Sequence, residues 1–526
     1  MQLPEKYESM LMNILEDYPA YRDSLSRPWE RGLRLNPLKV REEETERVLR
    51  EVFSWKNSSG SVSKSLFETD GSISSGNASA VDKNLGLACE DAGFEDREIF
   101  ERILWSPLGY YIPAGAAPSA HPYFQAGLYY LQEPSAQAPA AELPVLPGDR
   151  VLDLCAAPGG KSTQLLAKLG GRGFLLANDP SAGRAAALRK NLELFGAANA
   201  FVTVEEPSRL AVRYPGYFDA ILVDAPCSGS GMFRKEPSMT AVYAERGPES
   251  YTALQEEILE AGISMLRPGG HLMYSTCTFS PEEDEWQVAK ALKRHPELSL
   301  LPLAGREYYA SGITRLPAEG SGLQNAEMLP LDSQSIKEDM ARTETFSAEI
   351  TERLSTCGRI YPHRVRGEGQ FLALFRKAGD EAALKEESCQ KGSYFHGVGE
   401  HLYLLPEGTR PLPGVRYLMT GLCVAKKKGK RLVPTQALAM ALSLEEWPKA
   451  LVLPAGDARV ARYLRGETIF LEKDDELREG KAATWLPEGL DLRSLLVTVD
   501  GYPLGFAREQ NGMLKNLRDA GWRVNG

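Results

Sequence analysis

Residues 153–161, which read DLCAAPGGK, have residue types and spacing that could bind a charged ligand. The segment 151–154 has the composition of a short buried strand, and 162–169 that of an amphipathic helix. Pro158-Gly159-Gly160 must therefore turn the backbone between them. Glycines allow backbone N–H groups to approach a ligand, and a helix N-terminus favours a carboxylate or phosphate. The pattern predicts a strand, loop and helix that together cradle a ligand.

The next strand narrows the choice of ligand. Residues 174–178 form a second apolar strand that ends in Asp179, where an acid can hydrogen-bond a ribose diol. The G-x-G-x-x-G pattern is absent, which disfavours a nicotinamide dinucleotide. A loop of N–H donors beside Lys161 suits a nucleoside with an amino-acid tail. We therefore expect S-adenosylmethionine as the cofactor.

Two later strands end in cysteine. Residues 218–223 lead into Asp224-Ala225-Pro226-Cys227, and 271–274 lead into Ser275-Thr276-Cys277. Ligands of an open parallel sheet bind outside the carboxyl ends of its strands. The glycine loop, Asp179, Asp224 and both cysteines are therefore expected to share one crevice.

These segments, in this order and with these spacings, resemble the NOL/NOP/SUN family of RNA cytosine-5 methyltransferases, in particular its bacterial RsmF-type branch. Gln132-Glu133-Pro134 matches the family's QEP segment, and RLNPLK at 34–39 resembles its N-terminal entry strand. The resemblance implies a class I, Rossmann-like, doubly wound α/β sheet. A small N-terminal α/β RNA-binding domain and a C-terminal β-rich, PUA-like module would flank it.

The resemblance also implies site residues. Cys277, Cys227 and Asp224 would be catalytic. Glu206 stands where the family has an aspartate, so this position departs from the pattern. The implied cofactor residues are Cys155, Ala156, Ala157, Pro158, Gly159, Gly160, Lys161, Asp179, Arg184, Glu206 and Asp224.

The chemistry follows from the weak nucleophilicity of cytosine carbon 5. Attack of a thiolate on carbon 6 breaks the ring conjugation and lets carbon 5 accept a sulfonium methyl group. The family pattern assigns this attack to Cys277 and removal of the carbon 5 proton to Cys227. The reverse assignment stays open, because DNA cytosine methyltransferases carry their nucleophile in a Pro-Cys loop like Pro226-Cys227. Asp224 would bind the N3 and exocyclic amine edge, and a protonated Asp224 would activate carbon 6.

At 526 residues the chain should form two or three domains. We expect an N-terminal RNA-binding domain at 1–120, with a disordered Ser- and Gly-rich insertion at 56–82. A methyltransferase domain should follow at 121–377, with a loop insertion at 304–347. An acidic linker at 378–392 and a PUA-like module at 393–526 complete the prediction.

The net charge of −10 excludes a protein that simply coats nucleic acid, so basic residues that bind RNA must be local. Seven cysteines without a C-x-x-C pair predict neither a disulfide framework nor a metal site, and fit a reducing cytoplasm. No export signal or membrane-spanning segment is expected, and we expect a monomer. The candidate phosphate contacts are Arg34, Lys39, Arg359, His363, Arg364, Arg366, Lys427, Lys515, Arg518 and Arg523.

The leading hypothesis is methylation of a cytosine in structured RNA, most plausibly ribosomal RNA of the small subunit, free or within a ribosomal subunit. Transfer RNA is the main rival substrate. A non-catalytic RNA-binding assembly factor is disfavoured, because the glycine loop, Asp224 and both cysteines are intact. A small-molecule methyltransferase would leave the flanking domains without a purpose.

Overall fold

The computed structural model describes residues 1–55, 100–314, 346–379 and 394–524. The predicted insertion at 56–82 lies outside these residues, as do most of the insertion at 304–347 and of the linker at 378–392. No helix in the described part of the chain combines the length and hydropathy needed to cross a lipid bilayer.

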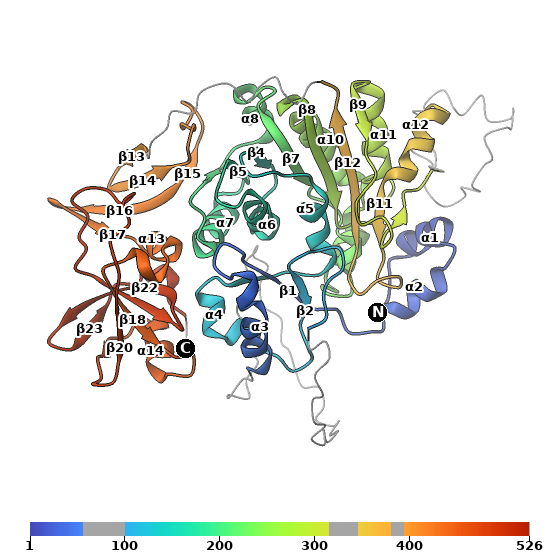
Figure 1. Ribbon diagram of the computed structural model, residues 1–526. Coiled ribbons are helices and arrows are strands. Elements are labelled where there is room, and N and C mark those ends of the chain that lie inside the picture. The colour runs from blue at the N-terminus through green and yellow to red at the C-terminus, as the bar shows by residue number, and fades with distance from the viewer. Residues whose placement is uncertain (56–99, 315–345, 380–393, 525–526) are drawn as a thin grey trace, which may run out of the picture.

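A ten-stranded sheet forms the centre of the molecule (Figure 1). Its strands are β4 (Arg150–Asp153), β5 (Phe174–Asn178), β6 (Ala200–Thr203), β7 (Phe218–Asp224), β8 (Leu266–Thr276), β9 (Leu298–Leu300), β10 (Ala310–Ser311), β11 (Gly358–Ile360), β12 (Gln370–Lys377) and β15 (Tyr417–Thr420). Their order is β10-β11-β12-β8-β7-β4-β5-β6-β15, with β9 also paired to β12. Strands β4 to β8 are parallel, and β12 runs antiparallel beside β8. This arrangement confirms the predicted Rossmann-like sheet.

Helices cover both faces of this sheet (Figure 1). One apolar core lies under α5 (Ala138–Glu142), α6 (Gly160–Leu169) and α7 (Ala182–Phe195). A second core on the opposite face lies under α8 (Pro207–Arg213), α10 (Glu249–Met265) and α11 (Glu285–Arg294). Two shorter helices, α9 (Met239–Arg246) and α12 (Ala348–Arg353), complete this part of the chain. Because β4 to β8 are buried on both faces, they read as nearly continuous apolar runs, which is why their positions were predictable.

The N-terminal part begins with α1 (Glu5–Ile14), α2 (Tyr18–Ser24) and α3 (Thr45–Ser54) and carries its own antiparallel sheet. The sheet consists of β1 (Gly32–Leu35), β2 (Gly109–Tyr111) and β3 (Tyr129–Leu131), in the order β2-β1-β3, and α4 (Pro122–Gln125) precedes β3. We placed the domain boundary at residue 120, but β3 pairs with β1, with Leu33 opposite Leu131. A pairing across almost a hundred residues leaves no local signal in the sequence.

The C-terminal part differs from the single module that we expected at 393–526. It forms a four-stranded sheet of β13 (Tyr394–Val398), β14 (His401–Leu405), β16 (Leu422–Lys428) and β17 (Arg431–Pro434). A second, six-stranded sheet contains β18 (Lys449–Leu453), β19 (Ile469–Phe470), β20 (Glu476–Glu479), β21 (Leu495–Val499), β22 (Tyr502–Gln510) and β23 (Met513–Asn516). Helices α13 (Gln436–Ala441) and α14 (Ala458–Leu464) accompany them. Strand β15, which lies between β14 and β16 in the sequence, is not part of the four-stranded sheet and pairs with β6 of the central sheet.

The N-terminal sheet and the six-stranded C-terminal sheet share one apolar core. Leu33 and Val48 belong to the same buried cluster as Leu451 and Tyr463. The hydroxyl of Tyr123 also donates to Asp500 Oδ2 at 2.8 Å. The N-terminal sheet and the six-stranded C-terminal sheet therefore pack together, and the N-terminal sheet lies below the central sheet in the view of Figure 1.

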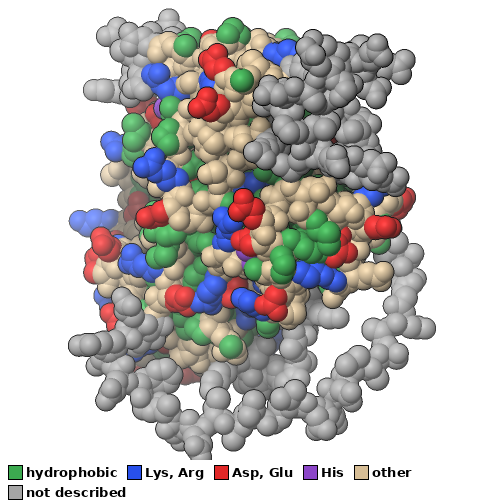
Figure 2. All heavy atoms as spheres, turned by 90° about the vertical axis from the view of Figure 1, so that its right-hand side faces the viewer, with side chains coloured by type: hydrophobic (Ala, Val, Ile, Leu, Met, Phe, Trp, Pro, Cys, Tyr) green, Lys and Arg blue, Asp and Glu red, His purple; other side chains and the backbone are tan. Residues whose placement is uncertain are grey.

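The face that carries α1 and α2 is drawn in Figure 2, where acidic, basic and apolar side chains are interspersed. No broad surface of one charge appears on the described residues of that face.

Asn36 joins the N-terminal sheet to the central domain. Its side chain is fully buried, and Nδ2 donates to the carbonyls of Gly127 and Phe195, each at 2.8 Å. Its Oδ1 accepts from the backbone N–H of Leu38 at 3.0 Å.

We expect Asn36→Ala to lower the free energy of unfolding by about 3 kcal/mol, because it removes three hydrogen bonds and leaves buried partners unsatisfied. Thermal and urea denaturation would measure the loss. Asn13→Ala, at an exposed position in α1, is the matched control and should change stability little. Equal stability of the two variants would contradict the assigned bridging contact.

Candidate active site

The glycine loop connects β4 to α6 at the centre of the sheet. Gly159 has φ +114°, a left-handed conformation that L side chains rarely adopt, and it immediately precedes the first residue of α6. The loop is held from α7, since Asn191 Nδ2 donates to the Pro158 carbonyl at 2.8 Å and Arg184 Nη2 to the Ala157 carbonyl at 3.2 Å. The predicted cradle is therefore present, with the N-terminus of α6 facing the loop.

A pocket of about 350 Å³ lies against this loop. On the catalytic side its wall contains Asp153, Cys155, Ala156, Ala157, Pro158, Gly160, Lys161 and Asp224. The opposite wall comes from the N-terminal part and includes Tyr129, Tyr130, Leu131, Gln132 and Glu133. Strand β3 thus closes the cofactor side of the site, a role that the sequence did not reveal.

The pocket wall suits S-adenosylmethionine in two respects. Asp153 is fully buried, and its Oδ2 accepts from Ser162 at 2.6 Å while Oδ1 has no partner among the described residues. Burial raises the pKa of Asp153 to about 7. An unpaired acceptor beside a helix N-terminus fits the ammonium and carboxylate ends of an amino-acid tail.

The second respect is charge. Three carboxylates, at the ends of β4, β5 and β7, lie near the Cys155 thiol. Burial and the charges of these residues, Asp153, Asp224 and Asp179, raise the pKa of Cys155 well above its ordinary range. A cationic sulfonium is the kind of group that such a cluster stabilises. These residues would hold the cofactor, which supplies an activated methyl group when bound.

The remaining predicted cofactor residues lie outside the pocket wall. Asp179 is buried behind the loop, where Oδ1 accepts from the Ser181 N–H at 2.9 Å and Oδ2 lies 3.4 Å from Arg184. Glu206 is exposed at the start of α8. Its neighbour Glu205 is turned away to accept from the backbone N–H of Arg416 at 2.8 Å. The assignment of Glu206 as a cofactor contact is thus not supported by its position.

The two cysteines meet at the carboxyl ends of the neighbouring strands β7 and β8. Cys227 Sγ and Cys277 Sγ are 3.4 Å apart, and both residues are partly accessible. A hydrogen bond with Cys277, burial and the charge of Cys277 raise the pKa of Cys227 well above its ordinary range. Cys227 is therefore held as the thiol.

Asp224 and Lys161 lie beside the cysteines. Lys161 Nζ donates to Asp224 Oδ2 at 2.7 Å. Burial lowers the pKa of Lys161, but Asp224 and the nearby Cys277 sulfur outweigh it, so its pKa lies above its ordinary value. Lys161 is thus a permanent positive charge between the cofactor loop and the Cys277 sulfur.

Asp224 also accepts from Ser275 Oγ at 2.8 Å and from Gln370 Nε2 at 3.3 Å. Three donors therefore face the Asp224 carboxyl group and fix its orientation.

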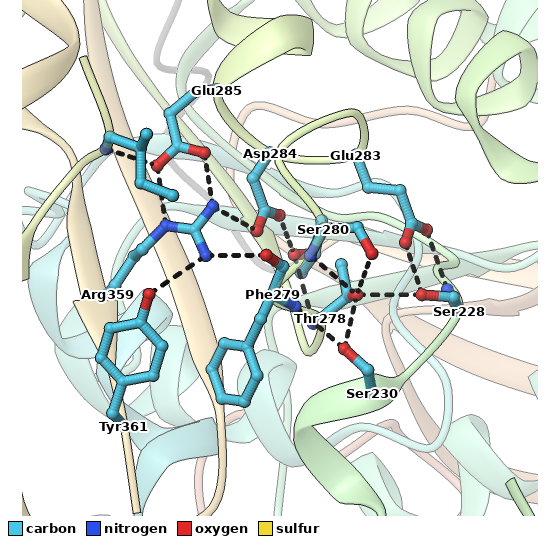
Figure 3. A network of polar contacts seen from close by, with 12 residues as sticks. Ser228, Ser230, Thr278, Phe279, Ser280, Glu283, Asp284, Glu285, Arg359 and Tyr361 are labelled. Atoms are coloured by element: carbon cyan, nitrogen blue, oxygen red, sulfur yellow. Dashed lines mark hydrogen bonds and ion pairs between the residues drawn. The ribbon is translucent and has the colours of Figure 1, made fainter. Parts of the chain in front are cut away.

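A buried polar network fixes the two loops that carry the cysteines (Figure 3). Glu283 accepts from the backbone N–H of Ser228 at 2.8 Å and from its hydroxyl at 2.5 Å. The Ser228 hydroxyl lies 2.9 Å from Thr278 Oγ1, which is also 2.9 Å from Ser230 Oγ. Because Ser228 follows Cys227 and Thr278 follows Cys277, these bonds set the position of both sulfurs.

Arg359 anchors the far side of this network (Figure 3). Its guanidinium is buried between Asp284, at 3.2 Å, and Glu285, whose Oε1 accepts from Nε at 2.7 Å. Nη1 donates to the Phe279 carbonyl at 3.0 Å. The predicted phosphate contact of Arg359 is therefore wrong, because both of its acidic partners are internal.

Several other predicted RNA contacts also serve internal interactions. Arg34 is buried and donates to the Gly160 carbonyl at 2.8 Å and to Thr163 Oγ1 at 2.6 Å, which joins β1 to the cofactor loop. Lys39 Nζ donates to the carbonyls of Ala126 and Leu194. Neither side chain can reach a phosphate in this arrangement.

Arg518 is likewise buried and donates to the Trp522 carbonyl at 2.9 Å. His363 is almost fully buried and lies 3.0 Å from Asp17. These two expected contacts are wrong for the same reason: both side chains are buried inside the fold.

The remaining candidates are accessible. Arg364 lies 3.2 Å from Asp17, and Arg366 lies 2.9 Å from Glu30. Lys427 on β16, Lys515 on β23 and Arg523 are exposed on the C-terminal sheets and beyond. Lys427, Lys515 and Arg523 remain available for RNA.

Sequence reasoning missed two groups of site residues. Gln370 opens β12 and reaches Asp224 only because β12 runs antiparallel beside β8. Met232 and Lys235 follow the Cys227 loop and line the pocket near Asp224. No local motif marks any of them, although their closeness in sequence to Cys227 was a usable hint for Met232 and Lys235.

Comparison with known proteins extends these observations. The family model for 16S rRNA methyltransferase RsmB/F matches residues 140–376. The models for the RsmF rRNA methyltransferase first C-terminal domain and the methyltransferase RsmF PUA domain match 381–442 and 450–524. These two matches divide the C-terminal part as its two sheets do.

Curated relatives agree over most of the chain. A ribosomal RNA small subunit methyltransferase F from Klebsiella pneumoniae is 30% identical over 404 residues, covering 74% of this chain and 77% of that protein. The protein of the same name from Salmonella agona is 29% identical over 422 residues, covering 74% and 77%. Among solved structures, PH0851 shares the fold, with a TM-score of 0.51 and 23% identity over 70% of this chain and 65% of that one.

One enzyme family thus matches the catalytic segment, which carries the glycine loop and the paired sulfurs, and both C-terminal segments. The chain belongs to the RsmB/F family of 16S rRNA methyltransferases, and it is an S-adenosylmethionine-dependent enzyme that methylates ribosomal RNA.

Proposed function

We propose that this enzyme methylates carbon 5 of a specific cytosine in small-subunit ribosomal RNA through a covalent bond between Cys277 and the base. The observation that carries the proposal is the 3.4 Å approach of the Cys227 and Cys277 sulfurs beside the pair formed by Lys161 and Asp224. Two cysteines next to one cofactor pocket suit a reaction that first adds and then eliminates a thiolate.

In the proposed reaction the Cys277 sulfur bonds to carbon 6, and the electron pair of the 5,6 double bond moves to carbon 5. Carbon 5 then takes the activated methyl group. Removal of the carbon 5 proton restores the double bond and expels the Cys277 thiolate. Lys161, which is positively charged and close to Cys277, would stabilise the thiolate before attack and after release.

The state of Cys227 supports this division of roles. The hydrogen bond with Cys277 and the charge of Cys277 both raise the pKa of Cys227. Both disappear when the Cys277 sulfur becomes a thioether, so Cys227 becomes easier to deprotonate at the stage when a base is needed. The same thiol is held protonated while Cys277 acts as the nucleophile.

Asp224 would bind the exocyclic amine of the cytosine. Its carboxylate is oriented by Lys161, Ser275 and Gln370, and accepts hydrogen bonds from all three. An N–H donor on the base can share these acceptor oxygens, whereas the carbonyl that uracil carries at that position would be repelled. Asp224 would thus distinguish cytosine from uracil.

The small-subunit substrate rests on the named relatives, whose printed function is methylation of small-subunit ribosomal RNA. The exposed Lys427 and Lys515 place basic groups on both C-terminal sheets, where phosphates could bind. We propose that the enzyme acts as a monomer in the cytoplasm. Transfer RNA remains the alternative substrate.

Bisulfite sequencing of total RNA from cells with and without the gene should reveal one cytosine in small-subunit RNA that resists conversion only when the gene is present. A protected cytosine in transfer RNA instead would favour the alternative substrate. Identical conversion in both strains would contradict cytosine-5 methylation.

We expect Cys227→Ala to accumulate a covalent RNA adduct that survives denaturing electrophoresis, because methylation proceeds but elimination stalls. Cys277→Ala should form no adduct and no product. Cys423→Ala, at a buried position in β16 far along the chain from both sulfurs, should behave as wild type. An adduct with Cys277→Ala and none with Cys227→Ala would reverse the two roles.

Asp224→Asn should lower kcat by about 100-fold, because it disturbs the binding of the cytosine edge, and should also weaken cofactor binding, because it removes one charge from the acidic cluster beside the sulfonium. Methyl-transfer kinetics and titration calorimetry would separate the two effects. Asp219→Asn is the matched control on the same strand. Asp219 lies 2.6 Å from Arg267, so its loss should lower the melting temperature and leave kcat unchanged. Similar kcat values for both variants would remove Asp224 from the mechanism.

A further inference from the structure

Most of the basic side chains close to the site are already paired within the protein. Arg34 and Arg359 are buried, and Arg364 and Arg366 face Asp17 and Glu30. Lys235 is different. It lines the catalytic pocket, and among the described residues no carboxylate lies within ion-pair distance of its ammonium.

The group that does contact Lys235 is an aromatic ring. Its Nζ lies 5.5 Å from the centroid of the Trp29 ring, within cation–π range. Trp29 exposes 39% of its surface, which makes it a large, accessible aromatic side chain at the edge of the catalytic pocket. The exposed indole face is therefore available to a ligand that enters beside Lys235.

Buried contacts hold both segments. Arg234 Nη2 lies 2.6 Å from Glu368, and Nη1 donates to the Ser24 carbonyl at 3.2 Å, at the end of α2. This arginine therefore ties the segment before Trp29 to the segment that carries Lys235. On the other side of Trp29, Glu30 accepts from Arg366 Nη2 at 2.9 Å. The loop that carries Trp29 is fixed at both ends.

We propose that Trp29 and Lys235 form a nucleotide-binding site for the RNA strand next to the target cytosine. The exposed indole stacks on a flanking base, and the Lys235 ammonium contacts the adjacent phosphate. A cytosine must leave its stack to reach a catalytic pocket, so its neighbours lose a stacking partner that an aromatic side chain can replace. This inference rests on the proposed RNA substrate and adds a residue pair that positions it.

The arrangement also accounts for the ion pairs of Arg364 and Arg366. Arg364 and Arg366, which we expected to bind phosphate, bind the acids of the N-terminal segment instead. They act as supports of the loop that carries Trp29. In this proposal Trp29 and Lys235 contact the RNA here, instead of Arg364 and Arg366.

The test uses the full-length enzyme and a small-subunit RNA transcript that contains the modified cytosine. Trp29→Ala should raise the KM for RNA about tenfold, the usual effect of losing one stacked base, with kcat at saturating RNA and cofactor affinity unchanged. Trp29→Phe should recover most of the affinity. Val212→Ala removes an exposed apolar side chain from α8 and should match wild type. An unchanged KM for Trp29→Ala would overturn the proposal.

Lys235→Ala should weaken RNA binding and reduce the dependence of log Kd on log salt by about one phosphate contact, whereas Lys235→Arg should keep both. RNA titrations that follow tryptophan fluorescence should show quenching that Trp29→Phe abolishes. Quenching without any methylation by the wild-type enzyme would contradict the proposed reaction and retain this site. Methylation that is insensitive to Trp29 and Lys235 would remove this site and retain the reaction.

Discussion

The active site depends on a buried ion-pair and hydrogen-bond network that runs from Arg359 to Ser228. Arg359 pairs with Asp284 and Glu285, and the adjacent Glu283 accepts both donors of Ser228. Charged groups are costly inside a protein unless their partners are complete, so such a network has few alternative arrangements. The two sulfurs lie at the edge of this rigid structure, which explains how loops fifty residues apart can hold them at hydrogen-bond distance.

The catalytic domain does not form its cofactor pocket alone. Strand β3 and the turn that follows it supply one wall, and Arg34 binds the first turn of α6 from the N-terminal sheet. The same sheet shares its core with the C-terminal sheet. The flanking parts therefore have a structural function in addition to any contact with RNA, since loss of either would open the cofactor site or remove its support.

An acidic protein that acts on RNA must separate its structural cations from its binding cations. Arg34, Arg359 and Arg518 are buried and compensate internal carboxylates or carbonyls. Lys427 and Lys515 on the C-terminal sheets, by contrast, are accessible. The negative net charge then limits non-specific binding, while a few positioned side chains determine where the RNA lies.

The amino-acid sequence by itself determined the central sheet, the glycine loop and the identity of both cysteines, because these depend on local signals: apolar runs, glycine turns and residues that end strands. The pairing of the cysteines was also predictable, since neighbouring parallel strands bring their carboxyl ends together. The division of the terminal domains was not. Strand β3 pairs with a strand almost a hundred residues earlier, and β15 joins β6 from more than two hundred residues away.

Only the tertiary structure shows which charged side chains are exposed and which are buried against internal partners. The sequence shows Arg34 and Lys427 alike as members of clusters of basic residues, yet one is buried against the cofactor loop and the other is exposed. A guanidinium binds whichever acceptor folding brings near it, and that acceptor is usually distant in the chain. Gln370, Trp29 and Lys235 became site residues for the same reason: contacts between distant segments, rather than local patterns, place side chains in a pocket.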